Sequence, residues 1–218
     1  MSLPTLSLLQ TRVLGVLVEK QLTVPDTYPL TLNALVAGCN QKSSREPVIE
    51  ASEAEVQLAI DQLKSLSLVI ESSGGRVMRY AHNVQRVLAI PAQAVAILTV
   101  LMLRGPQTAG ELRIHTDRLH RFSDISAVEG FLHELASRTS GPLVVELPRQ
   151  AGARETRWAH LLSGAPDLSA AAEAAPPPER ATVGEIAALR ATVDELRTEL
   201  AAVRADVDRL LAELGVSR

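Results

Sequence analysis

The sequence of 218 residues has little cysteine, few aromatic residues and no long apolar run. Its single cysteine, Cys39, excludes a disulfide within the chain and is typical of a reducing compartment. Aromatic residues make up only 2% of the chain, so the core must be aliphatic, which favours helices over sheets. No uncharged apolar run is long enough to span a membrane, and no basic and apolar leader opens the chain. We therefore expect a cytoplasmic protein with no membrane partner.

An excess of charge of one sign is also missing from most of the chain. The formal net charge is −3, and the surplus of carboxylates lies in residues 165–218. Residues 1–87 and 88–164 are each close to neutral. A neutral body neither demands nor excludes a nucleic-acid partner, so only local clusters of basic side chains could indicate one.

Motifs for catalysis and metal binding are absent as well. Cys39 has no basic neighbour in sequence that would lower its pKa, so we expect a buried structural thiol. His115 and His120 are not spaced by the four residues that place two metal ligands on one helix face. Gly74-Gly75 is explained by a turn rather than by a phosphate-binding loop. We expect no enzyme activity and no cofactor.

What the sequence does contain is a repeated order of helices followed by a β-hairpin. Pro29 suits the first turn of a helix that runs to Cys39, and an apolar helix over residues 91–104 is closed by Gly105-Pro106. Four Ser/Thr-x-x-Glu/Gln signatures predict helix starts, because the hydroxyl can accept from the amide three residues on. They are Ser7 to Gln10, Ser52 to Glu55, Thr108 to Glu111 and Ser126 to Glu129.

Two hairpins are predicted, at residues 68–82 around Ser-Gly-Gly and at residues 142–162. Both contain Arg-x-x-Arg, an aromatic residue, Ala and His, with Tyr80 and Trp158 at the aromatic position. We interpret this as a tandem repeat of a three-helix module with a hairpin wing, a winged helix. The predicted fold is mainly α with small β-hairpin wings, arranged as winged-helix domains at residues 1–87 and 88–164. Tyr80 and Trp158 are expected to anchor the wings to their cores.

The C-terminal part is predicted to be a linker and a coiled coil. Residues 165–181 are rich in Ala and Pro without apolar periodicity, which is typical of a linker. Residues 182–215 carry apolar residues in alternating steps of three and four, which predicts a parallel two-stranded coiled coil and a homodimer. The alternative is a surface helix that packs on its own body. The predicted dimer contacts are Ile186, Leu189, Val193, Leu196, Leu200, Val203, Val207 and Leu210.

Basic and amide side chains in loops and wings could hold the phosphates of double-stranded DNA without reading its sequence. The third helix of each module is less suited to the DNA groove, because Glu53, Glu55 and Asp61 in the first and Glu129 and Glu134 in the second repel phosphates. The candidate contact residues are Asn40, Gln41, Lys42, Arg45, Arg76, Arg79, Arg154 and Arg157.

Each of these residues has an ordinary alternative role. Lys42 and Arg45 could instead pair with Glu46 or Glu50, and arginines along a hairpin are commonly solvated. A further basic run around Arg113, Arg118 and Arg121 could be only a polar helix face and loop.

Several motifs resemble the YceH family of uncharacterised bacterial proteins. They are residues 17–20 (LVEK), Tyr28-Pro29-Leu30, Asn33, CNQKSSREPV at 39–48, LRG at 103–105, QTAGELR at 107–113, FSD at 122–124 and RWAHLLSG at 157–164. The resemblance covers residues 5–164 and implies a tandem winged-helix fold. It implies no established activity, because the suggested regulatory role rests on fold analogy.

Two functions remain as hypotheses. The first is a dimeric DNA-binding protein, a possible transcriptional regulator, that contacts phosphates through both wings and loop 40–46. The alternative is a protein-interaction adaptor that uses the winged helices and the coiled coil. The acidic third helices and the neutral body motivate the adaptor.

Overall fold

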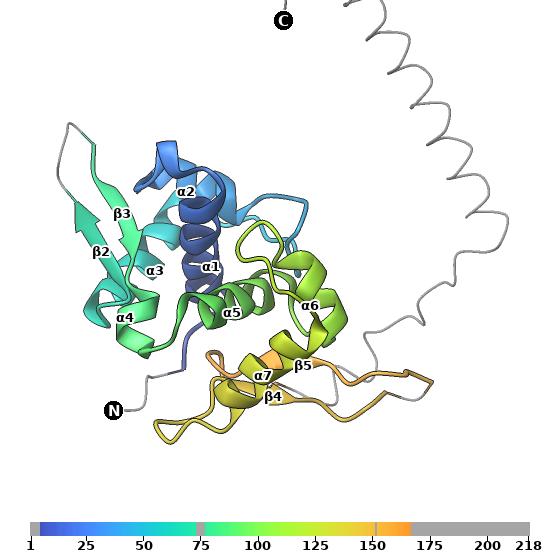
Figure 1. Cartoon of the computed structure of the whole chain (residues 1–218). Helices are drawn as coiled ribbons and strands as arrows, with labels where there is room; N and C mark the ends of the chain where they lie inside the picture. Colours follow the sequence, from blue (N-terminus) through green and yellow to red (C-terminus); the bar gives the residue numbers. More distant parts are fainter. Residues whose placement is uncertain (1–4, 73–76, 151, 167–218) are drawn as a thin grey trace, which may run out of the picture. The chain divides into compact units, whose positions relative to one another are not determined.

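The computed structural model describes residues 5–72, 77–150 and 152–166 of the chain, which belong to one compact unit (Figure 1). The predicted coiled-coil helix and most of the predicted linker lie outside the described residues, as does Arg76. The elements of the described part are, in order, α1 Leu8–Thr23, η1 Pro25–Thr27, β1 Leu30–Thr31, α2 Leu32–Cys39, α3 Glu53–Ser65, β2 Val69–Ser72, β3 Arg79–His82, α4 Val84–Leu88, α5 Ala92–Arg104, α6 Ala109–His115, α7 Ile125–Ala136, β4 Val144–Glu146 and β5 Trp158–His160. The described chain is therefore mainly helical with small antiparallel sheets, as the composition predicts.

The first half begins with helices whose starts are set by side-chain caps. Ser7 and Ser52 each form a full capping box at the N-termini of α1 and α3, as the signatures predict. The start of α2 differs from the prediction, because Pro29 lies before the helix and not in its first turn. The Thr31 hydroxyl accepts from the amide of Ala34, and residues 30–31 are extended as β1.

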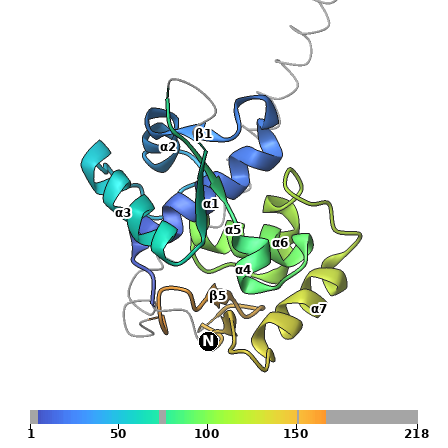
Figure 2. The ribbon, with the colours of Figure 1, turned by 90° about the vertical axis from the view of Figure 1, so that its left-hand side faces the viewer.

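Strands β2 and β3 follow α3 and join β1, which precedes α2, in a sheet of order β1-β3-β2 whose pairs are all antiparallel. Tyr80 of β3 is 4% exposed, and its hydroxyl donates to Gln57 of α3, so it anchors the hairpin as expected. Figure 2 shows α3 beside this sheet, with α1 behind both. The strand β1 was not predicted, since two residues carry no readable alternation.

The second half repeats the order of helices and hairpin. Gly105 closes α5 with φ of +73°, a left-handed conformation that favours glycine, and Thr108 forms the predicted capping box on α6. The predicted start of α7 at Ser126 is wrong by two residues, because the Asp124 carboxylate accepts from the amide of Ala127 at 2.8 Å and caps the helix earlier. Strands β4 and β5 form the second hairpin, with Trp158 5% exposed.

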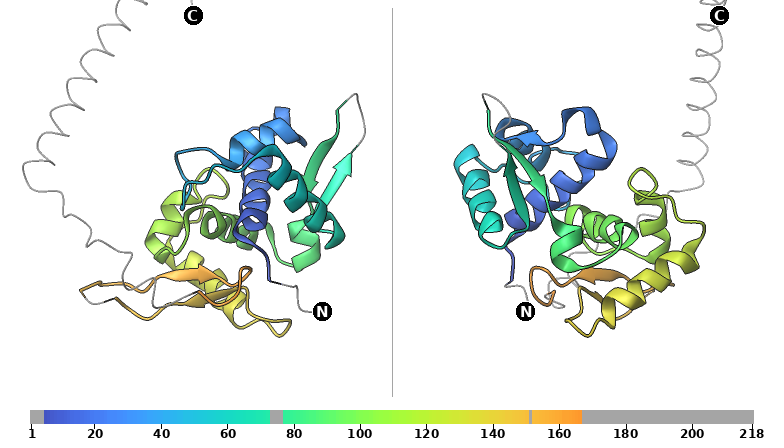
Figure 3. Two further views of the ribbon diagram at one scale, coloured as in Figure 1. Left: turned by 180° about the vertical axis from the view of Figure 1, so that it is seen from behind. Right: turned by 60° about the vertical axis from the view of Figure 1, so that its left-hand side comes forward.

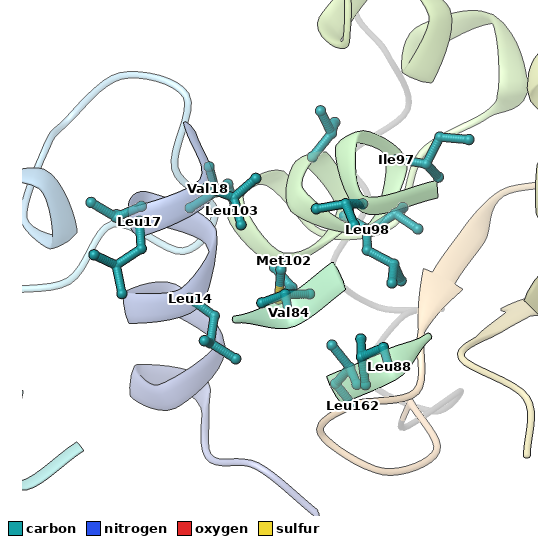
Figure 4. Close-up of a cluster of buried hydrophobic side chains, with 14 of the residues drawn as sticks. Leu14, Leu17, Val18, Val84, Leu88, Ile97, Leu98, Met102, Leu103 and Leu162 are labelled. Atoms are coloured by element: carbon teal, nitrogen blue, oxygen red, sulfur yellow. The ribbon is translucent and has the colours of Figure 1, made fainter. Parts of the chain in front are cut away.

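The core lies where α1 crosses α5. Figure 4 shows aliphatic side chains from α1, α4 and α5 gathered in one cluster with Leu162. Gly15 permits the close approach of the helices, since a Cβ there would lie 2.8 Å from the Cδ2 of Leu103. The two halves therefore share a continuous aliphatic core. No helix of the described ranges is both long enough and apolar enough to cross a membrane.

Candidate interaction surfaces

Arg45, a predicted phosphate contact, is buried. Its guanidinium donates to both carboxylate oxygens of Glu19 on α1, at 2.6 and 3.2 Å, and to the carbonyl oxygens of Gly38 and Ser44. The Arg45 side chain has no exposed surface, so from this position it cannot contact a phosphate. The expected pairing with Glu46 or Glu50 is also wrong for Arg45, because Glu19 is its partner.

Asn40 and Gln41 also bond within the loop that joins α2 and α3. The Asn40 side chain donates to the carbonyl oxygen of Ala51 and accepts from the amide of Ala51, both at 2.8 Å. Gln41 donates to the carbonyl oxygen of Ser43. The bonds of Asn40 join the two ends of the loop, whereas the bond of Gln41 is local to its first residues.

A second buried arginine, Arg12 on α1, was not singled out in the sequence. It donates to the carbonyl oxygens of Cys39 at 3.1 Å and Pro47 at 2.6 Å, on either side of the loop. Burial, together with the positive charge of Arg45, lowers the pKa of Arg12. The signal that could have found it is a lone arginine between Thr11 and Val13, inside an apolar helix stripe.

Cys39 lies beside these arginines and is fully buried, as predicted. Burial raises the pKa of its thiol to about 12, although the positive charges of Arg12 and Arg45 act in the opposite direction. The thiol is therefore neutral at physiological pH and is a poor nucleophile.

The candidate cations that remain among the described residues are all exposed: Lys42, Arg79, Arg154 and Arg157. Lys42 and Arg154 form no hydrogen bond or ion pair with any described residue. Arg79 donates to the carbonyl oxygen of Pro29 at 2.8 Å, and Arg157 lies 3.8 Å from a carboxylate oxygen of Glu111. Strand β3, which carries Arg79, and the loop over residues 40–52 lie on opposite sides of α1 (Figures 1 and 3). These cations therefore do not form one compact cluster.

The outer surfaces of the third helices carry carboxylates and apolar side chains. On α3, Leu58 is 60% exposed and has Glu55 and Asp61 one turn before and after it. Hydrogen bonds from Ser52 lower the pKa of the Glu55 carboxyl, which keeps it ionised. In the second half, Ile125 of α7 is 44% exposed and Ile114 of α6 is 69% exposed. The isoleucines and Leu58 were not singled out in the sequence, although Leu58 lies off the predicted apolar stripe of its helix.

The histidines of the two hairpins are neutral. Burial lowers the pKa of His82 and of His160 to about 4, so neither adds positive charge near neutral pH. His82 contacts Gln21 through Nε2 at 2.6 Å. No group of three or more His, Cys, Asp or Glu residues that could hold a metal ion occurs in the described residues.

Sequence comparison places this chain in a known family. Residues 6–153 match the family described as "Protein of unknown function, DUF480". A UPF0502 protein of Methylibium petroleiphilum is 64% identical over 91% of this chain and 85% of its own length. UPF0502 proteins of Dechloromonas aromatica and Burkholderia ambifaria are 61% and 55% identical over 91% of this chain and 92% and 90% of theirs.

The chain therefore belongs to the UPF0502 family, also called YceH, which confirms the resemblance seen in the sequence motifs. A match over 91% of the chain is longer than residues 5–164, so it includes part of the C-terminal segment. The names of these relatives state no activity.

Proposed function

We propose that this chain is a non-catalytic protein-interaction adaptor built from two winged-helix domains in tandem, residues 1–87 and 88–164. The order of elements supports this architecture, since α1, α2 and α3 precede the β2–β3 hairpin and α5, α6 and α7 precede the β4–β5 hairpin.

The observation that carries the proposal is the chemistry of the exposed surface of α3. In a DNA-binding winged helix the third helix enters the major groove, where phosphates surround it. Here that helix presents Glu53, Glu55 and Asp61 beside an exposed Leu58 in the first half. Carboxylates repel a polyanion, whereas an exposed leucine with a polar rim suits a protein surface.

Photo-crosslinking tests the adaptor. The full chain carries benzoylphenylalanine in place of Leu58, and a matched protein carries it in place of exposed Lys42. We expect irradiation of cells to join position 58 to one abundant protein partner, which then binds purified wild-type protein saturably and binds the Leu58→Glu variant about tenfold more weakly. Crosslinks to nucleic acid at position 58, or none there, would contradict the adaptor.

A second candidate is binding of double-stranded DNA through the wings and loop 40–46. The observation that favours it is that Lys42 and Arg154 are exposed and pair with no carboxylate among the described residues. Its test is the affinity for duplex DNA across a salt series. DNA binding predicts that the logarithm of the binding constant falls steeply with the logarithm of the salt concentration, and that this slope is shallower in the Lys42→Glu/Arg154→Glu variant. A flat slope in the wild-type protein would contradict DNA binding.

A further inference from the structure

An open cleft lies beside β2, one of the two edge strands of the first sheet. Its volume is about 650 Å³, and its walls come from the end of α3, from β2 and from α4. Ile70 and Glu71 of β2 line one side, Lys64 of α3 and Arg86 of α4 line others, and Val69 also contributes. In Figure 1 this strand is at the outer edge of the sheet, with α4 below it.

The backbone of β2 presents unpaired groups along this edge. The amide of Asn83 donates to the carbonyl oxygen of Leu68, which marks Leu68 and Asn83 as a hydrogen-bonded pair. Because such pairs alternate along an antiparallel ladder, Ile70 bonds to Ala81 and Glu71 points its N–H and C=O away from β3. Outside the β2–β3 ladder, no described residue bonds to the peptide groups of Glu71. This edge is therefore free to pair with another extended strand.

The side chains of the cleft add apolar surface and a surplus of positive charge. Ile70 is 50% exposed and shares the cleft with the partly buried Val87. Lys64 pairs with Glu71 and, at 3.7 Å, with Asp61. Arg86 is exposed and forms no ion pair with any described residue. Among the residues that line the cleft, Lys64 and Arg86 exceed the single carboxylate of Glu71 by one positive charge, and Asp61 contacts Lys64 from outside this lining.

We infer that β2 binds an extended segment of a partner protein that adds as a further strand and places a carboxylate at Arg86 and an apolar side chain against Ile70. In this mode main-chain hydrogen bonds supply affinity and alternate side chains supply specificity. This inference rests on the proposed adaptor function. It states which kind of protein segment the β2 surface of the adaptor would bind.

A matched pair of variants at Glu71 tests the strand pairing. Glu71→Pro removes the outward N–H without removing a bond of the β2–β3 ladder, which an edge strand tolerates. Glu71→Ala loses the same carboxylate but keeps the N–H, so it is the control. The probe is a fluorescein-labelled peptide of alternating Val and Thr with one central Glu, followed by fluorescence anisotropy. We expect Glu71→Pro to weaken binding about tenfold relative to Glu71→Ala. Equal affinities, or no binding to wild-type protein, would overturn the inference.

Charge reversal tests the proposed contact between Arg86 and a carboxylate of the partner. The same peptide with Lys in place of Glu should bind wild-type protein about tenfold more weakly, and Arg86→Glu should reverse that preference. Arg118→Glu is the control, because Arg118 is exposed on the other half of the chain and forms no hydrogen bond or ion pair with a described residue. No preference between the two peptides would overturn the inference.

Amide hydrogen exchange provides a readout that is independent of any variant's stability. Peptide binding should slow exchange at Glu71 in the wild-type full chain, and unchanged exchange there would count against strand pairing. Self-association that is lost in Glu71→Pro would identify a second copy as the occupant and overturn the partner assignment. In a further outcome the peptides show no binding while the partner captured at position 58 still requires Leu58 for its affinity. That result would contradict only the inference about β2, and the proposed adaptor function would remain supported.

Discussion

At the scale of single residues, the loop between α2 and α3 depends on two buried arginines and one carboxylate. Arg45 pairs with Glu19, while Arg12 bonds only to carbonyl oxygens, and its Nε has no partner among the described residues. Loss of any one of these partners should lower the stability of the fold, because a buried charge without compensation is strongly destabilising.

Glu19→Gln should therefore lower the free energy of unfolding by about 3 kcal/mol, since it leaves Arg45 buried without a counter-charge. Urea denaturation followed by circular dichroism measures the change. Glu50→Gln is the control, because Glu50 is exposed in the same loop and should change stability by no more than about 0.5 kcal/mol. Equal losses in the two variants would show that the Glu19–Arg45 pair does not stabilise the loop.

The two partly buried hairpin histidines, His82 and His160, predict a dependence of stability on pH. The pKa of each is lowered to about 4 in the folded protein, whereas an unfolded histidine titrates near 6.5. The unfolded state therefore binds more protons below pH 6.5, so their contribution is full above that pH and is lost as the pH falls toward 4.

Each histidine should reduce the free energy of unfolding by up to about 1.4 kcal/mol per pH unit within this window. Urea denaturation at several pH values between 7 and 5 measures how the free energy of unfolding depends on pH. This range lies above the pH at which most carboxylates titrate. The double variant His82→Gln/His160→Gln should show a much shallower slope. Stability that is constant or rises on acidification would contradict burial of the neutral rings.

At the scale of the elements, close helix packing depends on glycines. A Cβ at Gly38 of α2 would lie 2.5 Å from the Cγ1 of Val16 on α1, and Val16 is fully buried and β-branched. Because Val16 has no free space to move into, the larger residue must separate the helices.

Gly38→Ala should therefore lower the free energy of unfolding by about 1–3 kcal/mol. Gly130→Ala on α7 is the matched control, because no atom lies within 4 Å of its Cβ position. An exposed helical glycine is replaced favourably by alanine, so this variant should gain about 0.5–1 kcal/mol. Thermal denaturation of both variants gives the comparison, and a stabilised Gly38→Ala protein would contradict the packing.

Local sequence signals predicted those elements whose causes are local. Ser7, Ser52 and Thr108 cap the helices that their signatures predict, because a capping box lies within four residues. Cys39 is buried as its place on an apolar helix stripe indicates, and Trp158 is buried as its repeated place in the hairpin indicates. The short elements β1 and α4 carry too few residues for a periodic pattern and were not predicted.

Long-range contacts explain why the candidate site was predicted less well. Arg45 looked like a solvated loop residue because its partner, Glu19, lies 26 residues earlier on another helix. The open edge of β2 depends on strand order, which hairpin motifs do not specify. Leu58 is exposed simply because it faces away from the buried stripe of Val56, Ala59 and Ile60.

At the scale of the whole molecule, the C-terminal heptads remain a prediction of a parallel dimer. Replacing Leu196 and Leu200 by Lys places charges at the predicted seam and should yield monomers, because buried charges cannot be paired there. Light scattering of the full chain measures the mass. The control changes Thr198 and Ala201, which lie off the predicted seam, to Lys and should leave the mass unchanged. An unchanged mass in the seam variant would contradict the predicted dimer.

The most direct measurement of the adaptor function is the affinity of the partner captured at position 58 for purified full-length variants. The account predicts that Leu58→Glu weakens binding about tenfold, while Lys42→Glu changes it by less than about twofold. Loss of binding in Lys42→Glu with no change in Leu58→Glu would contradict the account. The loop 40–46, and not the surface of α3, would then recognise the partner.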